Sequence, residues 1–291
     1  METAELLKRV RKVEIKTKGQ CSQLFSGEYH SAFKGRGMAF SEVREYQPGD
    51  EIRAIDWNVT ARMNHPYVKV FEEERELLVM LLVDVSASCM FGTYRQSKKE
   101  LITEVSAVLA YSAIRNNDKA GMLLFSDRVE QYIPPKKGSS HILRIIRELL
   151  DITPVDKGTD LVMALQFLNK VMKKQAVVFV LSDFMSPDYE STLRITARKH
   201  DVIGIHVYDQ REAGLTDVGL LQVTDPEHGN LLCIDTSSAA VRKSYAERYQ
   251  FHHRQVENIL RRSGVDAVTI GTHDNYIRTL MTLFERRTKG R

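Results

Sequence analysis

The chain has 291 residues, of which 43% are hydrophobic and 27% charged, with a formal net charge of +4. This composition is that of a globular protein with enough apolar residues for a full core, and it excludes a disordered chain. The small basic excess is weak support for nucleic-acid binding, which concentrates basic residues on one face. The cysteines, Cys21, Cys89 and Cys233, are far apart in the sequence. Their number and spacing argue against a disulfide framework or a zinc site and favour a reducing compartment.

The sequence contains no run of about 18 apolar residues that would predict a membrane-spanning helix. The N-terminal residues 1–5 also lack the apolar core of a signal peptide. We therefore expect a cytoplasmic protein without a transmembrane segment. A peripheral location at the inner membrane is the alternative.

Residues 1–76 are predicted to form a first domain with a basic helix and a charged collar. Residues 4–18 are rich in Lys and Arg and carry apolar residues at helical spacing. This pattern predicts a surface helix with one apolar stripe, or a helix that contacts anionic lipid or a partner. Residues 19–76 are dense in charge and turn formers, and residues 67–71 alternate as in a short strand. We expect a collar of short strands, held together by ion pairs or serving as a docking surface.

Residues 77–291 are predicted to form a second, α/β domain. Two continuous apolar runs, at residues 77–83 and 176–181, and a third at 202–207 that is apolar apart from His206, are typical of strands buried on both faces of a parallel sheet. Between the first two runs we predict a helix at 95–116, strands at 121–125 and 129–133, and helices at 139–150 and 160–173, with Pro134-Pro135 ending the second of these strands. A helix at 187–200 precedes the third run, and a hairpin of 220–223 with 231–234 follows it. The last predicted elements are a helix between caps at 236–238 and Gly264, a strand at 267–270, a helix at 276–284 and a frayed basic tail at 286–291. Strands that alternate with helices predict a Rossmann-like, doubly wound, mostly parallel sheet.

Oxygen-bearing side chains follow two of the apolar runs. Asp84, Ser86 and Ser88 come after the first run, Asp183 comes after the second, and Thr159 opens a helix between them. Ligands of open α/β sheets bind beyond the carboxyl ends of the strands, and alternate positions of an extended loop point to one side. Carboxylates and hydroxyls are hard donors, so we expect a divalent cation, Mg²⁺ first, with Mn²⁺ or Ca²⁺ as alternatives. The set leaves room for one outside oxygen, such as a partner's Glu or Asp.

Each of these residues has a plainer alternative role. Asp and Ser after a strand often cap the next helix, and Asp160 is better explained as such a cap. Cys89 is expected to be a small buried residue rather than a nucleophile. The adjacent His252 and His253 are not expected to share one helix face, and the other histidines are expected to be surface or core polar groups.

The five candidate ligands, Asp84, Ser86, Ser88, Thr159 and Asp183, resemble the metal-ion-dependent adhesion motif of von Willebrand factor A-like domains in order and spacing. Further strings resemble a bacterial family called domain-of-unknown-function family fifty-eight, over nearly the whole chain. These strings are residues 27–37, 43–50, 55–57 and 71–76. The resemblance implies a von Willebrand factor A-like fold and a role as adaptor or co-chaperone for a MoxR-type AAA+ ATPase. Because the chain lacks a P-loop sequence, the ATPase must be the partner.

We therefore expect a metal-dependent protein-interaction module rather than an enzyme, with a MoxR-type AAA+ ATPase and a carboxylate-bearing client as partners. One alternative is a Mg²⁺-dependent phosphohydrolase with Asp84 as nucleophile, although Ser86 stands where a second Asp would help. Another is a basic protein that binds nucleic acid or a membrane surface through its N-terminal helix and its tail.

Overall fold

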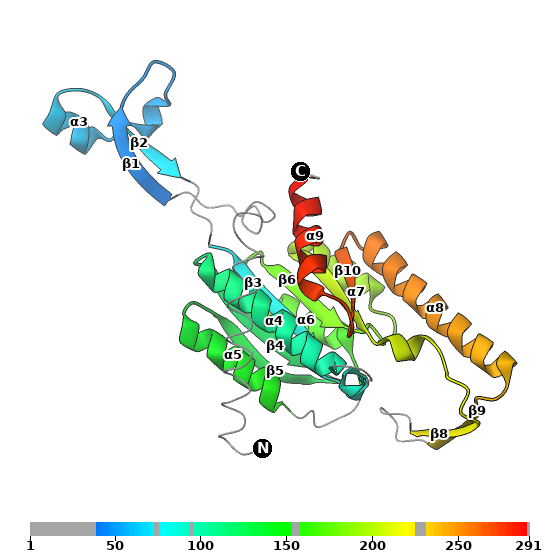
Figure 1. Cartoon of the computed structure of the whole chain (residues 1–291). Helices are drawn as coiled ribbons and strands as arrows, with labels where there is room; N and C mark the ends of the chain where they lie inside the picture. The colour runs from blue at the N-terminus through cyan, green and yellow to red at the C-terminus, as the bar shows by residue number, and fades with distance from the viewer. Residues whose placement is uncertain (1–38, 73–75, 93–95, 153–157, 225–230, 290–291) are drawn as a thin grey trace. The chain divides into compact units, whose positions relative to one another are not determined.

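A computed structural model of the protein describes residues 39–72, 76–92, 96–152, 158–224 and 231–289 (Figure 1). These residues form two compact units, a smaller one that ends at Leu77 and a larger one that begins at Leu78, and each is described by itself. The predicted basic helix at 4–18 and the string at 27–37 lie outside the described residues.

The smaller unit is built on an antiparallel pair of strands. Its elements are β1 (Ala39–Glu45), the 3-10 turn η1 (Ile52–Ala54), α3 (Trp57–Met63) and β2 (Tyr67–Glu72). The Arg44 guanidinium donates to both carboxylate oxygens of Asp50, at 2.7 and 2.8 Å, across the turn that leaves β1. The collar is therefore held in part by an ion pair. It also contains a helix that the expectation of short strands omitted, because Asp56 caps α3 by accepting from the N–H groups of Asn58 and Val59.

The larger unit contains a six-stranded sheet with the order β10-β7-β6-β3-β4-β5, in which only the β4–β5 pair is antiparallel. Its strands are β3 (Leu78–Asp84), β4 (Lys119–Phe125), β5 (Val129–Lys136), β6 (Val177–Ser182), β7 (Asp201–Tyr208) and β10 (Asp266–Gly271). Helices α4 (Lys98–Arg115), α5 (Ser139–Asp151), α6 (Leu161–Val171), α7 (Glu190–Lys199), α8 (Ala239–Arg262) and α9 (Tyr276–Lys289) surround it. The short elements are η2 (Ala87–Met90), η3 (Gln210–Ala213) and the hairpin of β8 (Leu220–Thr224) with β9 (Leu231–Asp235). The predicted α/β fold class, with a doubly wound and mostly parallel sheet, is confirmed in this architecture.

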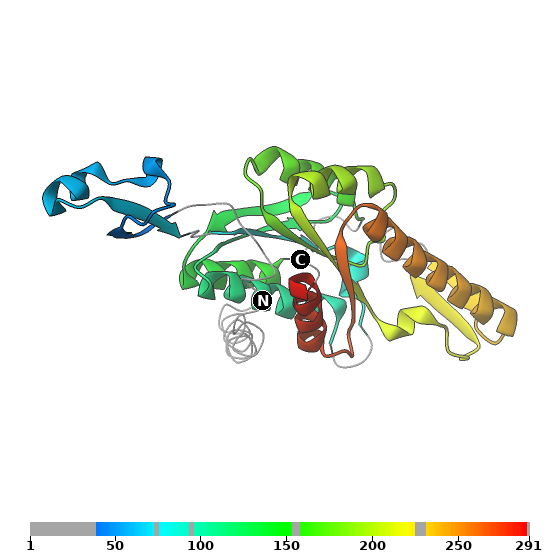
Figure 2. The same cartoon turned by 90° about the horizontal axis from the view of Figure 1, so that it is seen from above.

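Both faces of the sheet are covered by helices, with α4, α5 and α9 on one side and α6, α7 and α8 on the other (Figure 2). This explains why β3 is apolar at every position before Asp84 instead of alternating, since Met80 and Leu82 pack toward α6 while the residues between them face the other helix layer. A β3 residue without a large apolar side chain would leave a void in one layer or the other.

Two sequence predictions about the edges of this unit are wrong. Pro134-Pro135 does not end β5, which continues to Lys136. Proline is tolerated there because β5 is an edge strand and the register shifts next to the prolines. Gly121 on the neighbouring strand makes the approach possible, because a Cβ at this position would lie 2.8 Å from both the Ile133 oxygen and the Pro135 nitrogen.

Residues 285–289 do not form a frayed tail, because α9 continues to Lys289. Arg287 is buried in this last turn and donates to Asp201 at 2.7 Å. It also lies 3.0 Å from the Asp266 carboxylate. One arginine thus joins α9 to the first residues of β7 and β10.

Successive strands are added on opposite sides of β3, so the strand order reverses between β3 and β6. The order runs from β3 outward through β4 to β5 and then returns to β6, β7 and β10 on the other side of β3. The loops that leave β3 and β6 therefore diverge, which opens a crevice at the carboxyl edge of the sheet. Asp84 and Asp183 lie at this crevice.

Candidate metal centre

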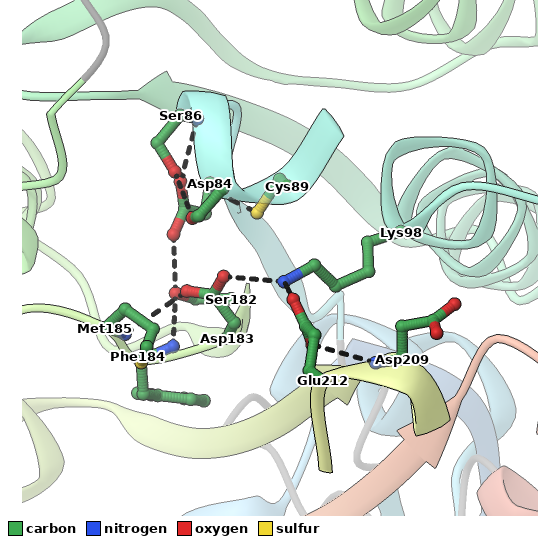
Figure 3. Close-up of polar contacts among 11 residues, drawn as sticks. Asp84, Ser86, Cys89, Lys98, Ser182, Asp183, Phe184, Met185, Asp209 and Glu212 are labelled. Carbon is green, nitrogen blue, oxygen red and sulfur yellow. Dashed lines mark hydrogen bonds and ion pairs between the residues drawn. The ribbon is translucent and has the colours of Figure 1, made fainter. Parts of the chain in front are cut away.

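The two predicted aspartates are brought together by the parallel pairing of β3 with β6. Val83 lies opposite Leu181 in the register, so the next residues on each strand, Asp84 and Ser182, also face each other. The Ser182 hydroxyl donates to Asp84 Oδ2 at 2.6 Å (Figure 3). Asp183 follows one residue later, and its carboxylate comes within 4.8 Å of the Asp84 carboxylate.

The serines of the first loop complete this arrangement. The Ser86 N–H donates to Asp84 Oδ1 at 2.9 Å, so both oxygens of Asp84 accept a hydrogen bond. The hydroxyl oxygens of Ser86 and Ser88 are 3.1 Å apart. Ser86 is fully buried and Ser88 half-buried, so the group opens outward on the side of Ser88.

Thr159 lies at the same edge of the sheet, in the loop before α6. The next residue, Asp160, donates its N–H to the Ser126 carbonyl at 2.8 Å, just after β4. Leu161 donates its N–H to the Ser186 hydroxyl at 3.1 Å, in the loop after β6. Thr159 is therefore tied between the loops on either side of β3. The Asp160 carboxylate accepts from Met163 N–H at 2.9 Å, which confirms its predicted role as a helix cap.

The loop after β6 is bent sharply around Asp183. The Phe184 N–H donates to the Ser182 hydroxyl at 2.8 Å, and the Met185 N–H donates to Asp183 Oδ1 at 3.2 Å. Phe184 adopts a left-handed backbone conformation with φ of 57°, which is unfavourable for a bulky residue and is held here by its complete burial. This turn fixes Asp183 Oδ1 through the Met185 N–H, while Asp183 Oδ2 accepts from Lys98.

The two carboxylates differ strongly in their electrostatics. Burial, reinforced by the neighbouring Asp183 charge, raises the pKa of Asp84 to about 6. Burial also acts to raise the pKa of Asp183, but the adjacent Lys98 ammonium outweighs it and holds that pKa below its ordinary value. Two buried carboxylates at this separation repel each other, so the site favours a cation between them.

Lys98 and its partner Glu212 are charged residues of this site that the sequence analysis did not find. Lys98 is 1% exposed, and its ammonium donates to Asp183 Oδ2 at 3.0 Å and to Glu212 Oε1 at 2.6 Å (Figure 3). Burial opposes its charge, but Asp183 and Glu212 together raise its pKa above the ordinary lysine value. The available signal was the Ser97–Glu100 capping box, which fixes the start of α4 and so places Lys98 in its first turn.

Glu212 is held in place by the elements that follow β7. Its second carboxylate oxygen accepts from the Asp209 N–H at 3.0 Å, and Asp209 in turn accepts from the Thr272 hydroxyl at 2.7 Å. Asp209 is 1% exposed and caps η3. The hydrogen bonds therefore run from the site through η3 to the loop after β10.

Cys89 is buried close to both aspartates, and its sulfur lies within 4.8 Å of their carboxylate oxygens. Burial, with the nearby Asp84 charge, raises the pKa of this thiol well above its ordinary value. The protonated thiol is a poor nucleophile and a weak ligand, which agrees with the expectation of a small buried residue.

Comparison with known families decides the relationship of the chain. A family described as protein of unknown function DUF58 matches residues 42–255. The chain belongs to the DUF58 family. This DUF58 protein is also 28% identical over 295 residues to an uncharacterized protein of Mycobacterium bovis, a match that covers 100% of this chain and 92% of the relative. The resemblance to domain-of-unknown-function family fifty-eight is thereby confirmed.

Solved structures share the fold of this DUF58 protein. The conserved hypothetical protein BatB from Bacteroides thetaiotaomicron has a TM-score of 0.50 at 15% identity, covering 73% of this chain and 99% of BatB. An aerotolerance-related membrane protein from Bacteroides fragilis has a TM-score of 0.50 at 16% identity, with the same coverage of 73% and 99%. At such low identity the likeness establishes the fold alone. In the part of the chain that the structure describes, no helix is long and apolar enough to cross a bilayer.

Proposed function

We propose that this protein is a metal-dependent protein-interaction module. The observation that carries the proposal is the pair of buried carboxylates, Asp84 and Asp183, which face each other beside the Ser86 and Ser88 hydroxyls. A divalent cation would be held by these residues, with Thr159 on the adjoining loop as the further ligand predicted from the sequence. When bound, it would offer an electrophilic position to one carboxylate oxygen of a partner.

The residues present fit such a cation in charge and in chemistry. Asp84, Asp183 and Glu212 contribute three negative charges around the single positive charge of Lys98, so a divalent ion would neutralise the cluster. The oxygens are hard donors, and the protonated Cys89 thiol does not shift the set toward soft metals. We expect Mg²⁺ first, with Mn²⁺ or Ca²⁺ as alternatives.

The surroundings of the site support docking of a protein. Met90 and Phe91, which follow Ser88, are both exposed, and so is Met185, which follows Asp183. Exposed large apolar side chains beside a polar centre are typical of protein interfaces, where methionine and aromatic residues are enriched. A partner carboxylate that reaches the cation would bring its neighbouring residues onto these side chains.

The partners follow from the family resemblance. We propose a MoxR-type AAA+ ATPase and a client protein that offers a Glu or Asp side chain. The resemblance alone supports the choice of ATPase, while the site geometry supports a carboxylate-bearing partner.

The first experiment measures Mg²⁺ and Mn²⁺ binding by isothermal titration calorimetry. Asp84→Asn keeps the shape of the side chain and removes its charge, and we expect it to weaken affinity more than about a hundredfold, beyond the loss typical of outer-shell changes. Asp127→Asn is the matched control, since Asp127 is a half-exposed aspartate at the same edge of the sheet. Equal metal affinities in Asp84→Asn and Asp127→Asn would show that Asp84 is not a metal ligand.

The second experiment tests the partner by affinity capture from the native lysate with mass spectrometry. The arms are wild type in Mg²⁺, wild type in chelator, and Asp84→Asn in Mg²⁺, with Asp127→Asn as control. We expect an AAA+ ATPase or a defined client in the first arm and in the control only. Identical captured proteins in every arm would overturn the metal site as the docking device.

A Mg²⁺-dependent phosphohydrolase remains the second candidate because Lys98 supplies a cation beside the aspartates. One observation counts against it. The Lys98 ammonium already contacts two carboxylates, Asp183 and Glu212, and would have to leave them to bind a phosphate. Hydrolysis of p-nitrophenyl phosphate with Mg²⁺ that disappears in Asp84→Asn and persists in Asp127→Asn would establish the enzyme instead.

A further inference from the structure

A cavity of about 200 Å³ adjoins the candidate metal centre and shares Lys98 and Asp183 with it. It lies between the carboxyl end of β7 and helix α8, and we call it the tyrosine–histidine pocket. Its defining wall residues are Tyr208, Tyr245, Tyr249, His206, His252 and His253. Drug-sized ligands fill cavities of roughly 300–1,000 Å³, so this volume suits a single side chain.

The walls of the pocket are aromatic rings packed on one another. The His253 ring lies 5.0 Å from the His206 ring between centroids, and it stacks on Tyr249 at 6.4 Å with an interplanar angle of 10°. Tyr208 meets His253 edge to face at 6.3 Å. Against expectation, His252 and His253 both line this one cavity, because it extends around the side of α8. Such walls favour a flat aromatic occupant.

The histidines that line the pocket also carry buried ring nitrogens that lack hydrogen-bond partners among the described residues. His206 is 4% exposed, and its Nδ1 has no hydrogen-bond partner there. His253 Nδ1 and His252 Nε2 are also buried and have no hydrogen-bond partner among the described residues. Buried polar atoms are satisfied in the great majority of native proteins, so these nitrogens call for an occupant with a hydrogen-bonding group.

The buried part of the pocket favours a neutral group, although the exposed Arg248 also lines the pocket. Burial, together with His253, lowers the pKa of His206 to about 3, so the ring is uncharged at neutral pH. The Lys98 ammonium at the floor of the pocket is already matched by Asp183 and Glu212. A neutral imidazole can donate to or accept from a hydroxyl, whereas an anion would find no unmatched buried cation in this set.

We propose that the tyrosine–histidine pocket binds the phenol ring of a tyrosine in the partner segment, next to the acidic residue that reaches the metal centre. The ring would lie against the tyrosines of α8, and its hydroxyl would hydrogen-bond a histidine nitrogen. The origin of the ring in a partner rests on the proposed function. The preference of the pocket for a phenol does not require a metal.

The test uses the full-length protein with ¹⁵N-labelled histidine and p-cresol as the probe, followed by NMR in metal-free buffer. We expect p-cresol to shift the ring nitrogens of His206 and His253 while exposed His65 stays unchanged. Toluene, which lacks the hydroxyl, is expected to bind about three- to tenfold more weakly, the value of one net hydrogen bond. Equal binding of toluene, or tighter binding of 3-methylindole, would overturn the assignment to tyrosine.

Two histidine variants test whether the preference for p-cresol over toluene depends on the pocket. His206→Phe keeps an aromatic ring and removes the nitrogens, so it should abolish the preference for p-cresol over toluene. His65→Phe makes the same exchange on the smaller unit and should keep the preference. If His206→Phe does not fold, the shifts in wild type still decide, since unmoved His206 and His253 signals would mean a pocket filled by solvent only. Because no metal is added, failure of the metal site leaves this result unaffected.

Discussion

Lys98 places one ammonium group between two carboxylates, Asp183 and Glu212, where water has almost no access. Removing such a charge from water costs several kcal/mol, which its two partners offset through close hydrogen bonds. Without the ammonium, Asp183 and Glu212 would be left with one another and with Asp84. Lys98 therefore sets how much negative charge the centre presents to an incoming cation.

Replacing Lys98 with methionine should destabilise the metal-free protein by about 3–5 kcal/mol, because the partner carboxylates lose their counter-charge. Urea denaturation in metal-free buffer measures the loss. Excess Mg²⁺ should restore part of it, because the cation can take over the neutralising role. Lys170→Met, on an exposed face of α6, is the control and should change stability by no more than about 0.5 kcal/mol. A loss as small as that of the control would contradict the role given to Lys98.

At the scale of elements, buried polar side chains join helices to the sheet in addition to apolar packing. The last turn of α9 is the clearest case. Arg287 reaches the first residues of two adjacent strands, Asp201 on β7 and Asp266 on β10. It thereby closes the amino edge of the sheet on the side opposite the candidate metal centre.

We expect Arg287→Leu to cost about 1.5–3 kcal/mol, the usual value of hydrogen bonds to a charged group. The loss should appear as faster amide hydrogen exchange in α9 and at the start of β10. Arg286→Leu is a matched control, since Arg286 is the exposed neighbour on the same turn. Unchanged exchange in Arg287→Leu would mean that apolar packing alone holds the helix.

At the scale of the whole molecule, buried neutral histidines make stability depend on pH. Burial, with Lys199 nearby, lowers the pKa of His200 to about 4, and its Nδ1 accepts from the Ala176 N–H at 3.3 Å. The unfolded chain binds a proton here below about pH 6.5, and the folded chain does so only below about 4. The contribution of neutral His200 to the free energy of unfolding is therefore fully present above about pH 6.5, and it is lost as the pH falls from about 6.5 to about 4.

His200→Asn keeps an acceptor for the Ala176 N–H and cannot be protonated. Between pH 7 and pH 5, wild type should lose more unfolding free energy than this variant, by on the order of 2 kcal/mol. Chemical denaturation at the two pH values measures the difference. The other histidines contribute equally to both proteins and cancel. Parallel pH profiles would show that His200 is not buried as a neutral ring.

The sequence predicted β3 and β6 well because they are apolar runs of strand length between helical segments. It also predicted that Asp84 and Asp183 meet, because the carboxyl ends of parallel strands share one edge. It did not predict Lys98, because a lysine in the first turn of a helix normally faces solvent and only tertiary packing buries it. The sequence analysis also missed α3 in the smaller unit. Its N-cap, Asp56, lies in a stretch dense with charge, where one more aspartate does not stand out as a cap.

The ion pairs of Lys98 join residues that are 85 and 114 positions apart in the chain. Contacts of such long range require large loops to close, so they form late in folding, after local helices and neighbouring strands. Interactions that are absent from the folding transition state mainly govern the rate of unfolding. The ion pairs of the buried Lys98 ammonium would thus slow unfolding of the protein and have little effect on its rate of folding.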